Sequence, residues 1–166
     1  MADRLRISVS TQGASNFEKL AKSFTVSQRR KALRPGARII LEEIRKQAPV
    51  GTKEHAYYTG RVKGQKKGNG KGQKVRTFKP GNLKRSFAIL TFKRSGDLFV
   101  GPRTGKKSPF DGFYAQFVEF GTSKMPAQPF VRPSVASKRG DAQKAIIRRA
   151  VEIINGEARK LQRRAS

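Results

Sequence analysis

Apolar and polar residues alternate at the start of the chain. Over Arg4–Ser10 every second residue is apolar, and this period of two predicts a half-buried β-strand. The pattern then becomes helical, because Ser15–Glu18 fits a capping box and apolar residues follow at helical spacing over Phe17–Phe24. We therefore predict a strand followed by a short helix.

A longer helix is predicted over Ser27–Gln47, with Ser27 as its capping residue. The apolar face of this helix consists of Ala37, Ile40, Leu41, Ile44 and Ala48. Pro35-Gly36 interrupts the pattern, so we expect a kink or a fresh start there. Pro49 then ends the helix.

Two short apolar runs farther along the chain predict a β-hairpin. Ser86–Phe92 and Asp97–Gly101 have the composition of strands, and Ser95-Gly96 between them is typical of a hairpin turn. Arg103–Gly112 is expected to be a polar loop.

The most apolar passage of the chain runs from Phe113 to Pro133. Its first part is dense in aromatic residues: Phe113, Tyr114, Phe117 and Phe120. Either a short helix or a buried strand over Tyr114–Phe120 would turn most of these side chains inward. Gly121 ends that element, and a long helix is predicted after Pro133. Its predicted inward face consists of Ile147, Ala150, Val151, Ile154, Ala158 and Leu161.

Together these elements predict an α+β fold in a single domain over residues 1–166. Its small antiparallel sheet would contain Arg4–Ser10, Ser86–Phe92 and Asp97–Gly101, with Tyr114–Phe120 as a fourth strand if it is not helical. The two long helices would pack on one face of this sheet.

The segment from residue 51 to residue 80 differs from the rest, because lysine and arginine alternate with glycine and Glu54 is its one acid. It has too few apolar side chains to form a core, so we predict an extended loop or a long hairpin inserted in the domain. The predicted contact residues of this segment, for nucleic acid or an acidic partner, are Arg61, Lys63, Lys66, Lys67, Lys71, Lys74 and Arg76. They could contact DNA phosphates, bind an acidic neighbouring subunit, or remain solvated without a partner.

The charge balance points to a polyanionic partner. The chain has 38 Lys and Arg against 11 Asp and Glu, a formal net charge of +27, which argues for nucleic acid or a surface rich in carboxylates. The absence of cysteine excludes disulfides and fits a reducing compartment. No apolar run is long enough for a bilayer and the N-terminus lacks a signal peptide, so we expect a soluble protein made in a cytoplasm without membrane contact.

The sequence offers no set of catalytic residues. His55 is the sole histidine, and the consecutive Glu42-Glu43 is the nearest approach to paired acids. Gly70-Lys71 and Gly105-Lys106 do not complete a phosphate loop, because the earlier glycine and the following Ser or Thr are missing. We therefore predict a protein that is not an enzyme and has no cofactor or metal site.

Four short motifs occur in a fixed order: APVGT at 48–52, GNLKRS at 81–86, YAQFVEFGT at 114–122 and PAQPFVRP at 126–133. From about residue 30 onward the chain therefore resembles a family of head–tail connection proteins of long-tailed bacteriophages, the small tail-completion or neck proteins described as minor tail components. The chain departs from the usual pattern in one respect. The first two motifs normally adjoin, whereas a long basic insertion separates them here.

The resemblance implies a structural virion protein at the head–tail junction or upper tail, acting in tail completion, as a tail terminator or in a neck ring. Its partners would be other neck and tail proteins and further copies of itself, in a ring of six by the symmetry of the tail, with DNA contact as a further implication. It would be made in the host cytoplasm and assembled into the virion. The residues implied at the subunit interface are Tyr114, Phe117, Glu119, Phe120, Gly121, Thr122, Pro129 and Phe130.

Glu119 is the least expected member of this set, because a carboxylate among apolar residues needs a partner. The partner could belong to the same subunit or to a neighbour, and we expect a neighbour. A second class of function is a basic, non-enzymatic nucleic-acid-binding protein, architectural or ribosome-associated. Such a protein has no need of the motif at Tyr114–Pro133, which favours the virion role.

Overall fold

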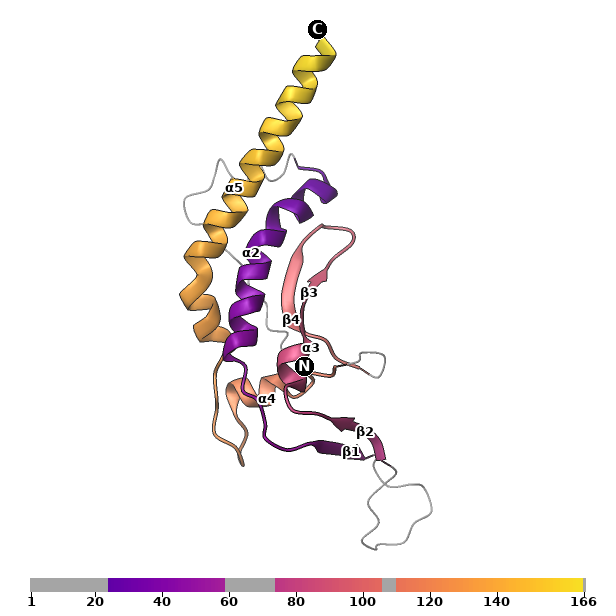
Figure 1. Ribbon diagram of the computed structural model, residues 1–166, viewed down its shortest axis with the longest axis vertical. Helices are drawn as coiled ribbons and strands as arrows, with labels where there is room; N and C mark the ends of the chain where they lie inside the picture. The colour runs from indigo at the N-terminus through magenta and orange to yellow at the C-terminus, as the bar shows by residue number, and fades with distance from the viewer. Residues whose placement is uncertain (1–23, 59–73, 106–109, 166) are drawn as a thin grey trace, which may run out of the picture.

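A computed structural model of the chain describes residues 24–58, 74–105 and 110–165. Its two longest elements are helix α2, Val26–Gln47, and helix α5, Val131–Ala165. They lie side by side and antiparallel, and α5 continues beyond the N-terminal end of α2 (Figure 1). Both long helices of the prediction are therefore confirmed, but α5 begins at Val131 and includes Pro133 in its first turn instead of following it.

Helix α2 begins one residue before the predicted cap. Thr25 is the N-cap, and its hydroxyl accepts a hydrogen bond from the Gln28 N–H at 3.3 Å while the Gln28 side chain reaches back to the Thr25 N–H. The prediction of Ser27 as the cap is therefore wrong, since only Thr25 has a glutamine three residues later to complete a capping box.

The helix also runs through Pro35 without a fresh start. The helix has tertiary contacts on both sides of the proline. Before it, the Arg29 guanidinium donates to the Ser95 carbonyl at 3.2 Å, and after it, Gly36 packs against α5. The N-terminal part of α2 bends away from α5 in Figure 1.

The crossing of α2 and α5 is very close. A Cβ added at Gly36 would lie 2.6 Å from Ile146 Cδ1 and 2.8 Å from the Ala142 carbonyl oxygen. Ala32 and Ala150 are also buried between the two helices. Small side chains on both helices therefore let the two backbones approach.

This crossing turns α5 away from its predicted orientation. Ile147 is 46% exposed and Val151 is 48% exposed, whereas Ala142 and Ala150 are buried. The prediction of Ile147 and Val151 on the inward face is wrong, because Ile146 and Ala142 occupy the contact with Gly36 and the neighbouring Ile147 and Val151 are turned outward. Ala150 is buried as predicted, Ile154 is partly buried, and the side chains of Ala158 and Leu161 lie outside the described residues.

The predicted hairpin is confirmed as strands β3, Phe87–Thr91, and β4, Leu98–Pro102, which pair antiparallel with Phe87 opposite Pro102 and Thr91 opposite Leu98. Gly96 in the turn has φ of 76°, a conformation that favours glycine. Helix α2 packs on this hairpin and α5 packs mainly on α2. The layers are thus hairpin, α2 and α5, and α2 separates much of α5 from the strands.

A second antiparallel pair is formed by β1, His55–Tyr58, and β2, Lys74–Phe78. These strands are the two ends of the basic segment, so the predicted long hairpin is confirmed at its base. The two strand pairs form separate sheets within the described residues. The predicted strand at Arg4–Ser10 and helix at Phe17–Phe24 lie outside them.

The core joins all of these layers. Phe87 from β3 meets Phe130 edge to face, with ring centroids 5.5 Å apart. Buried apolar side chains around this pair include Ile40, Leu41, Ile44, Leu83, Val100, Ala115, Val131 and Ala142. The α+β class is confirmed, and none of the described helices is long and apolar enough to cross a membrane.

Candidate interaction surface around helix α4

The aromatic passage folds as helix α4, Ala115–Phe120, so the alternative of a fourth strand is wrong. Ala115 and Glu119, four residues apart on one side of the helix, are buried. Phe117 is 42% exposed and Phe120 is 51% exposed. The expectation that most aromatic side chains turn inward is therefore wrong, because the acid takes the inward position.

Glu119 is 3% exposed, yet its carboxylate has several partners. Oε2 accepts hydrogen bonds from the backbone N–H groups of Phe130 at 2.8 Å and Val131 at 2.9 Å. Oε1 accepts one from the Arg132 N–H at 3.1 Å, and the Arg132 Nε lies 3.8 Å away.

These N–H groups are the unpaired donors at the start of α5, where the helix dipole also favours a negative charge. Glu119 therefore serves as a cap for α5 supplied from α4. The expectation of a partner in a neighbouring subunit is corrected by this geometry, since the carboxylate is buried and its contacts lie in its own chain.

Gly121 lets the chain fold back from α4 to α5. Its φ is 75°, and a Cβ there would lie 2.7 Å from the Ala127 nitrogen and 2.8 Å from the Met125 carbonyl oxygen. Beyond a tight turn at Thr122–Met125, the Gln128 N–H donates to the Val118 carbonyl at 2.8 Å. The chain leaving α4 is thus fixed on both sides of the turn.

Helix α3, Asn82–Ser86, holds the other end of this surface. The buried side-chain amide of Asn82 donates to the Asp111 carbonyl at 2.6 Å and to the Tyr114 hydroxyl at 3.1 Å. Its oxygen accepts from the Asp111 N–H at 3.3 Å. Gly112 packs against buried Ser86, whose Oγ would lie 2.2 Å from an added Cβ. The GNLKRS motif therefore positions the chain that enters α4.

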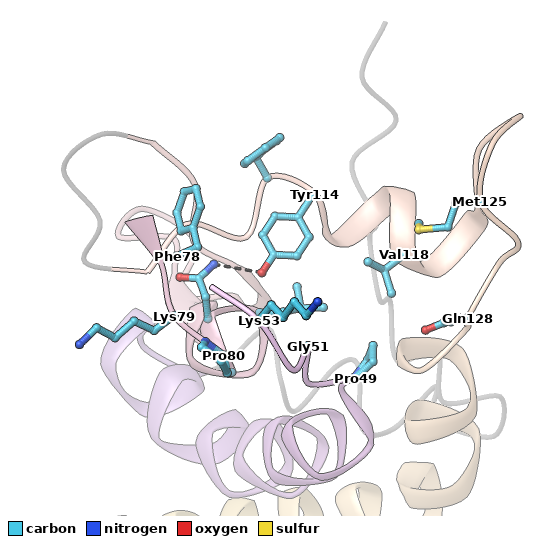
Figure 2. Close-up of a pocket in the computed structure, with 14 residues that line it drawn as sticks. Pro49, Gly51, Lys53, Phe78, Lys79, Pro80, Tyr114, Val118, Met125 and Gln128 are labelled. Atoms are coloured by element: carbon cyan, nitrogen blue, oxygen red, sulfur yellow. Dashed lines mark hydrogen bonds between the residues drawn. The ribbon is translucent and has the colours of Figure 1, made fainter. Parts of the chain in front are cut away.

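A pocket of about 470 Å³ lies between these elements (Figure 2). Its lining comes from three parts of the chain: Pro49, Gly51 and Lys53; Phe78, Lys79, Pro80, Gly81, Asn82 and Leu83; and Phe113, Tyr114, Val118, Met125 and Gln128. Each part contains or adjoins one of the motifs identified in the sequence. The fold thus brings the separated motifs together around one cavity.

The predicted interface residues divide between surface and core. Phe117, Phe120, Thr122 and Pro129 are exposed, whereas Tyr114 and Gly121 are partly buried. Glu119 and Phe130 are buried, Phe130 in the core against Phe87. The exposed members lie on or next to α4, so the structure brings them into one region.

The predicted basic contact residues fall mostly outside the described chain. This holds for Arg61, Lys63, Lys66, Lys67 and Lys71, and for the side chains of Lys74 and Arg76, whose backbone forms part of β2. Among the described residues no cluster of His, Asp and Glu could hold a metal ion.

Sequence reasoning missed the pocket itself. The sequence patterns assign no role to Lys53, Met125 or Gln128. They include Asn82 only as one residue of the GNLKRS motif. The signal that could have found the pocket is the set of four motifs, because each part of the lining contains or adjoins one of them.

The chain was also compared with known protein families. Residues 12–121 match the family described as "Bacteriophage HK97-gp10, putative tail-component". Searches of curated proteins and of solved structures found no match. The matched range ends at Gly121, so it includes α2, both hairpins, α3 and α4 but not α5. Because this range covers more than half of the 166 residues, the chain belongs to the HK97-gp10-like family of bacteriophage tail components.

Proposed function

We propose that this protein is a structural component of the virion at the head–tail junction or upper tail, where it completes the tail or closes the neck. Its partners are other neck and tail proteins, and identical subunits form a ring around the passage for DNA. The family of tail components supports the structural role. The ring and the position rest on the surface around α4.

The observation that carries this proposal is the pair Phe117 and Phe120, exposed on one side of α4. Large exposed aromatic side chains are frequent at the centres of protein interfaces. Glu119 and Gly121 fix the helix that bears them, so little conformational freedom is lost on docking. The Arg132 guanidinium lies 4.6 Å from the centre of the Phe120 ring and holds this side chain in place.

The charge of the subunit explains why such a contact would be apolar. Copies that each carry +27 repel one another, so a contact through charged surfaces between copies is unfavourable without screening. A contact made by Phe117 and Phe120 brings fewer like charges together than a contact through charged surfaces does. The proposed contact between subunits does not use a catalytic group. We propose that the protein has no enzymatic activity.

The test is assembly of particles from a phage that lacks its own copy of the protein and receives variants in trans. We expect the double variant Phe117→Ser/Phe120→Ser to block joining of heads to tails. Its melting temperature should remain close to wild type, because exposed substitutions change stability by only about 0.5 kcal/mol. Phe92→Ser is the matched control, since Phe92 is 56% exposed next to the β3–β4 turn. Normal particle yield from the double variant would contradict the proposal.

A second candidate function is contact with nucleic acid, supported by the net charge of +27. The cations of the basic segment and of α5 could neutralise phosphates without reading sequence. This contact is compatible with a subunit that surrounds DNA, and its salt dependence provides a separate test, given in the Discussion.

A further inference from the structure

We propose that the pocket beside α4 binds an extended segment of alternating apolar and acidic residues, contributed by an acidic partner protein of the tail. The proposal rests on the structural role proposed above and names the chemistry of one partner. Four features of the pocket support it: its lining, its lysines, its rigidity and the charge of the chain around it.

The lining is mainly apolar. Phe78, Tyr114, Val118 and Met125 provide much of it, and the cavity of about 470 Å³ lies in the range typical of ligand sites. In Figure 2 the Met125 side chain lies beside Val118, and Tyr114 stands across the cavity from them. A segment bound here would therefore bury apolar side chains.

The charged groups of the lining are all positive. The described lining contains two lysines, Lys53 and Lys79, and no arginine, aspartate or glutamate. Both lysines are exposed. Lys53 extends across the pocket below Tyr114 in Figure 2, whereas Lys79 lies at the rim and points outward. Neither lysine forms an ion pair with an acid of the described residues. A carboxylate on the bound segment would supply a partner for Lys53.

The walls are formed before any partner arrives. The Asn82 amide is already engaged with Asp111 and Tyr114, and the Gln128 N–H holds the opposite wall to α4. At Gly81 an added Cβ would meet no atom within 4 Å, so an incoming segment can approach the backbone there. A rigid site of this kind orders the segment without reorganising itself.

The charge of the chain decides between occupants. A second copy of this protein offers 11 acids against 38 cations, so it is a poor source of an acidic segment. Duplex DNA would satisfy the lysines but would leave the apolar lining without a partner. An acidic and apolar segment of another protein matches both parts of the pocket.

The probe for the test is an immobilised library of random ten-residue peptides, incubated with the full chain in about 0.15 M salt, where charges are screened beyond about 8 Å. We expect selection of peptides in which Asp or Glu alternates with Leu, Phe or Tyr. The affinity of a selected peptide is then measured by fluorescence anisotropy.

Three variants separate the pocket from the general charge of the protein. Lys53→Glu and Met125→Asp should each weaken the selected peptide by about tenfold or more, because both place a carboxylate against its acids. Lys144→Glu makes the same charge change as Lys53→Glu on the exposed surface of α5, and it should leave the affinity within about twofold. Circular dichroism confirms that each variant is folded.

Equal weakening by Lys53→Glu and Lys144→Glu would overturn the proposal, because binding would then reflect net charge alone. Selection of acidic peptides that lack apolar residues would also overturn it. So would a short DNA duplex that displaces the peptide from the wild-type protein and does not bind the Lys53→Glu variant. If the peptide test fails while Phe117→Ser/Phe120→Ser still blocks assembly, the pocket proposal falls and the structural role stands. If the peptide binds as expected and the double variant assembles normally, the position of the ring contact is wrong instead.

Discussion

The carboxylate of Glu119 accepts a hydrogen bond of 2.9 Å from the backbone N–H of Val131, twelve residues farther along the chain. This contact joins the last turn of α4 to the first turn of α5. It explains why an acid stands in the most apolar passage of the chain, since the unpaired N–H groups of a helix start are a favourable environment for a negative charge. The exposed aromatic side chains of α4 are positioned as a result.

Replacing Glu119 should therefore destabilise the protein. We expect Glu119→Ala to lower the free energy of unfolding by about 3–5 kcal/mol, because it leaves three buried or partly buried N–H groups without their acceptor. Glu119→Gln retains an oxygen acceptor and should cost less, about 1–2 kcal/mol. Urea unfolding followed by circular dichroism measures both.

Glu152 is the matched control for this series. It pairs with Arg149 at 2.6 Å on the surface of α5, with its side chain 51% exposed. Glu152→Gln should change the free energy of unfolding by less than about 1 kcal/mol, as is usual for exposed ion pairs. A Glu119→Ala variant as stable as Glu152→Gln would show that Glu119 is not the cap of α5.

The close crossing of α2 and α5 leads to a second prediction. Gly36→Ala should destabilise the protein, because overpacking costs about 1–3 kcal/mol and exceeds the gain of about 1 kcal/mol from helix propensity. Gly140→Ala in α5 should instead stabilise it by about 0.5–1 kcal/mol, since no atom lies within 4 Å of the added Cβ. Thermal unfolding should therefore show a lower melting temperature for Gly36→Ala and a higher one for Gly140→Ala. A higher melting temperature for both variants would refute the close contact at Gly36.

The third prediction concerns the basic segment. Because Tyr58 pairs with Lys74, residues 59–73 can be replaced by Asn-Gly to give a two-residue hairpin turn. We expect this variant to fold and to bind duplex DNA with a shallower salt dependence. The log–log slope should fall by about 0.9 for each phosphate that the shortened chain no longer neutralises. Fluorescence anisotropy over a range of salt concentrations measures the slope.

A full-length variant in which Arg61, Lys63, Lys66, Lys67 and Lys71 are all glutamine separates charge from length. It should reproduce the shallower slope if these cations contact phosphates. A slope equal to that of the wild type in both variants would assign DNA binding to other parts of the chain.

Local patterns were sufficient to predict α2 and the β3–β4 hairpin, but not the orientation of α5. The apolar spacing of α2 and the turn at Ser95-Gly96 are local signals, and both elements appear where predicted. The rotation of α5 is a tertiary property, because the contact of Ile146 and Ala142 with Gly36 decides which residues face inward. Apolar periodicity alone therefore placed Ile147 on the wrong face.

The site shows the same division. The sequence pointed to α4 and its flanking motifs, yet hydrophobicity predicted that Phe117 would be buried. The burial of Glu119 depends on the N–H groups of a helix that starts twelve residues later, which no local window contains. The pocket was missed for a similar reason, since Lys53 and Met125 come to line one cavity only in the folded chain.

The close contact at Gly36 also affects the position of the C-terminal end of α5. Helix α5 packs there against α2 and continues past the N-terminal end of α2, so the angle of the crossing determines where the end of α5 lies (Figure 1). From Ala150, the last of the described residues buried in this crossing, to Ala165 the helix spans about 22 Å, so a change of about 10° at the crossing would carry its tip about 4 Å sideways. The absence of a side chain at one glycine thus sets the direction in which the basic C-terminal end of the subunit points.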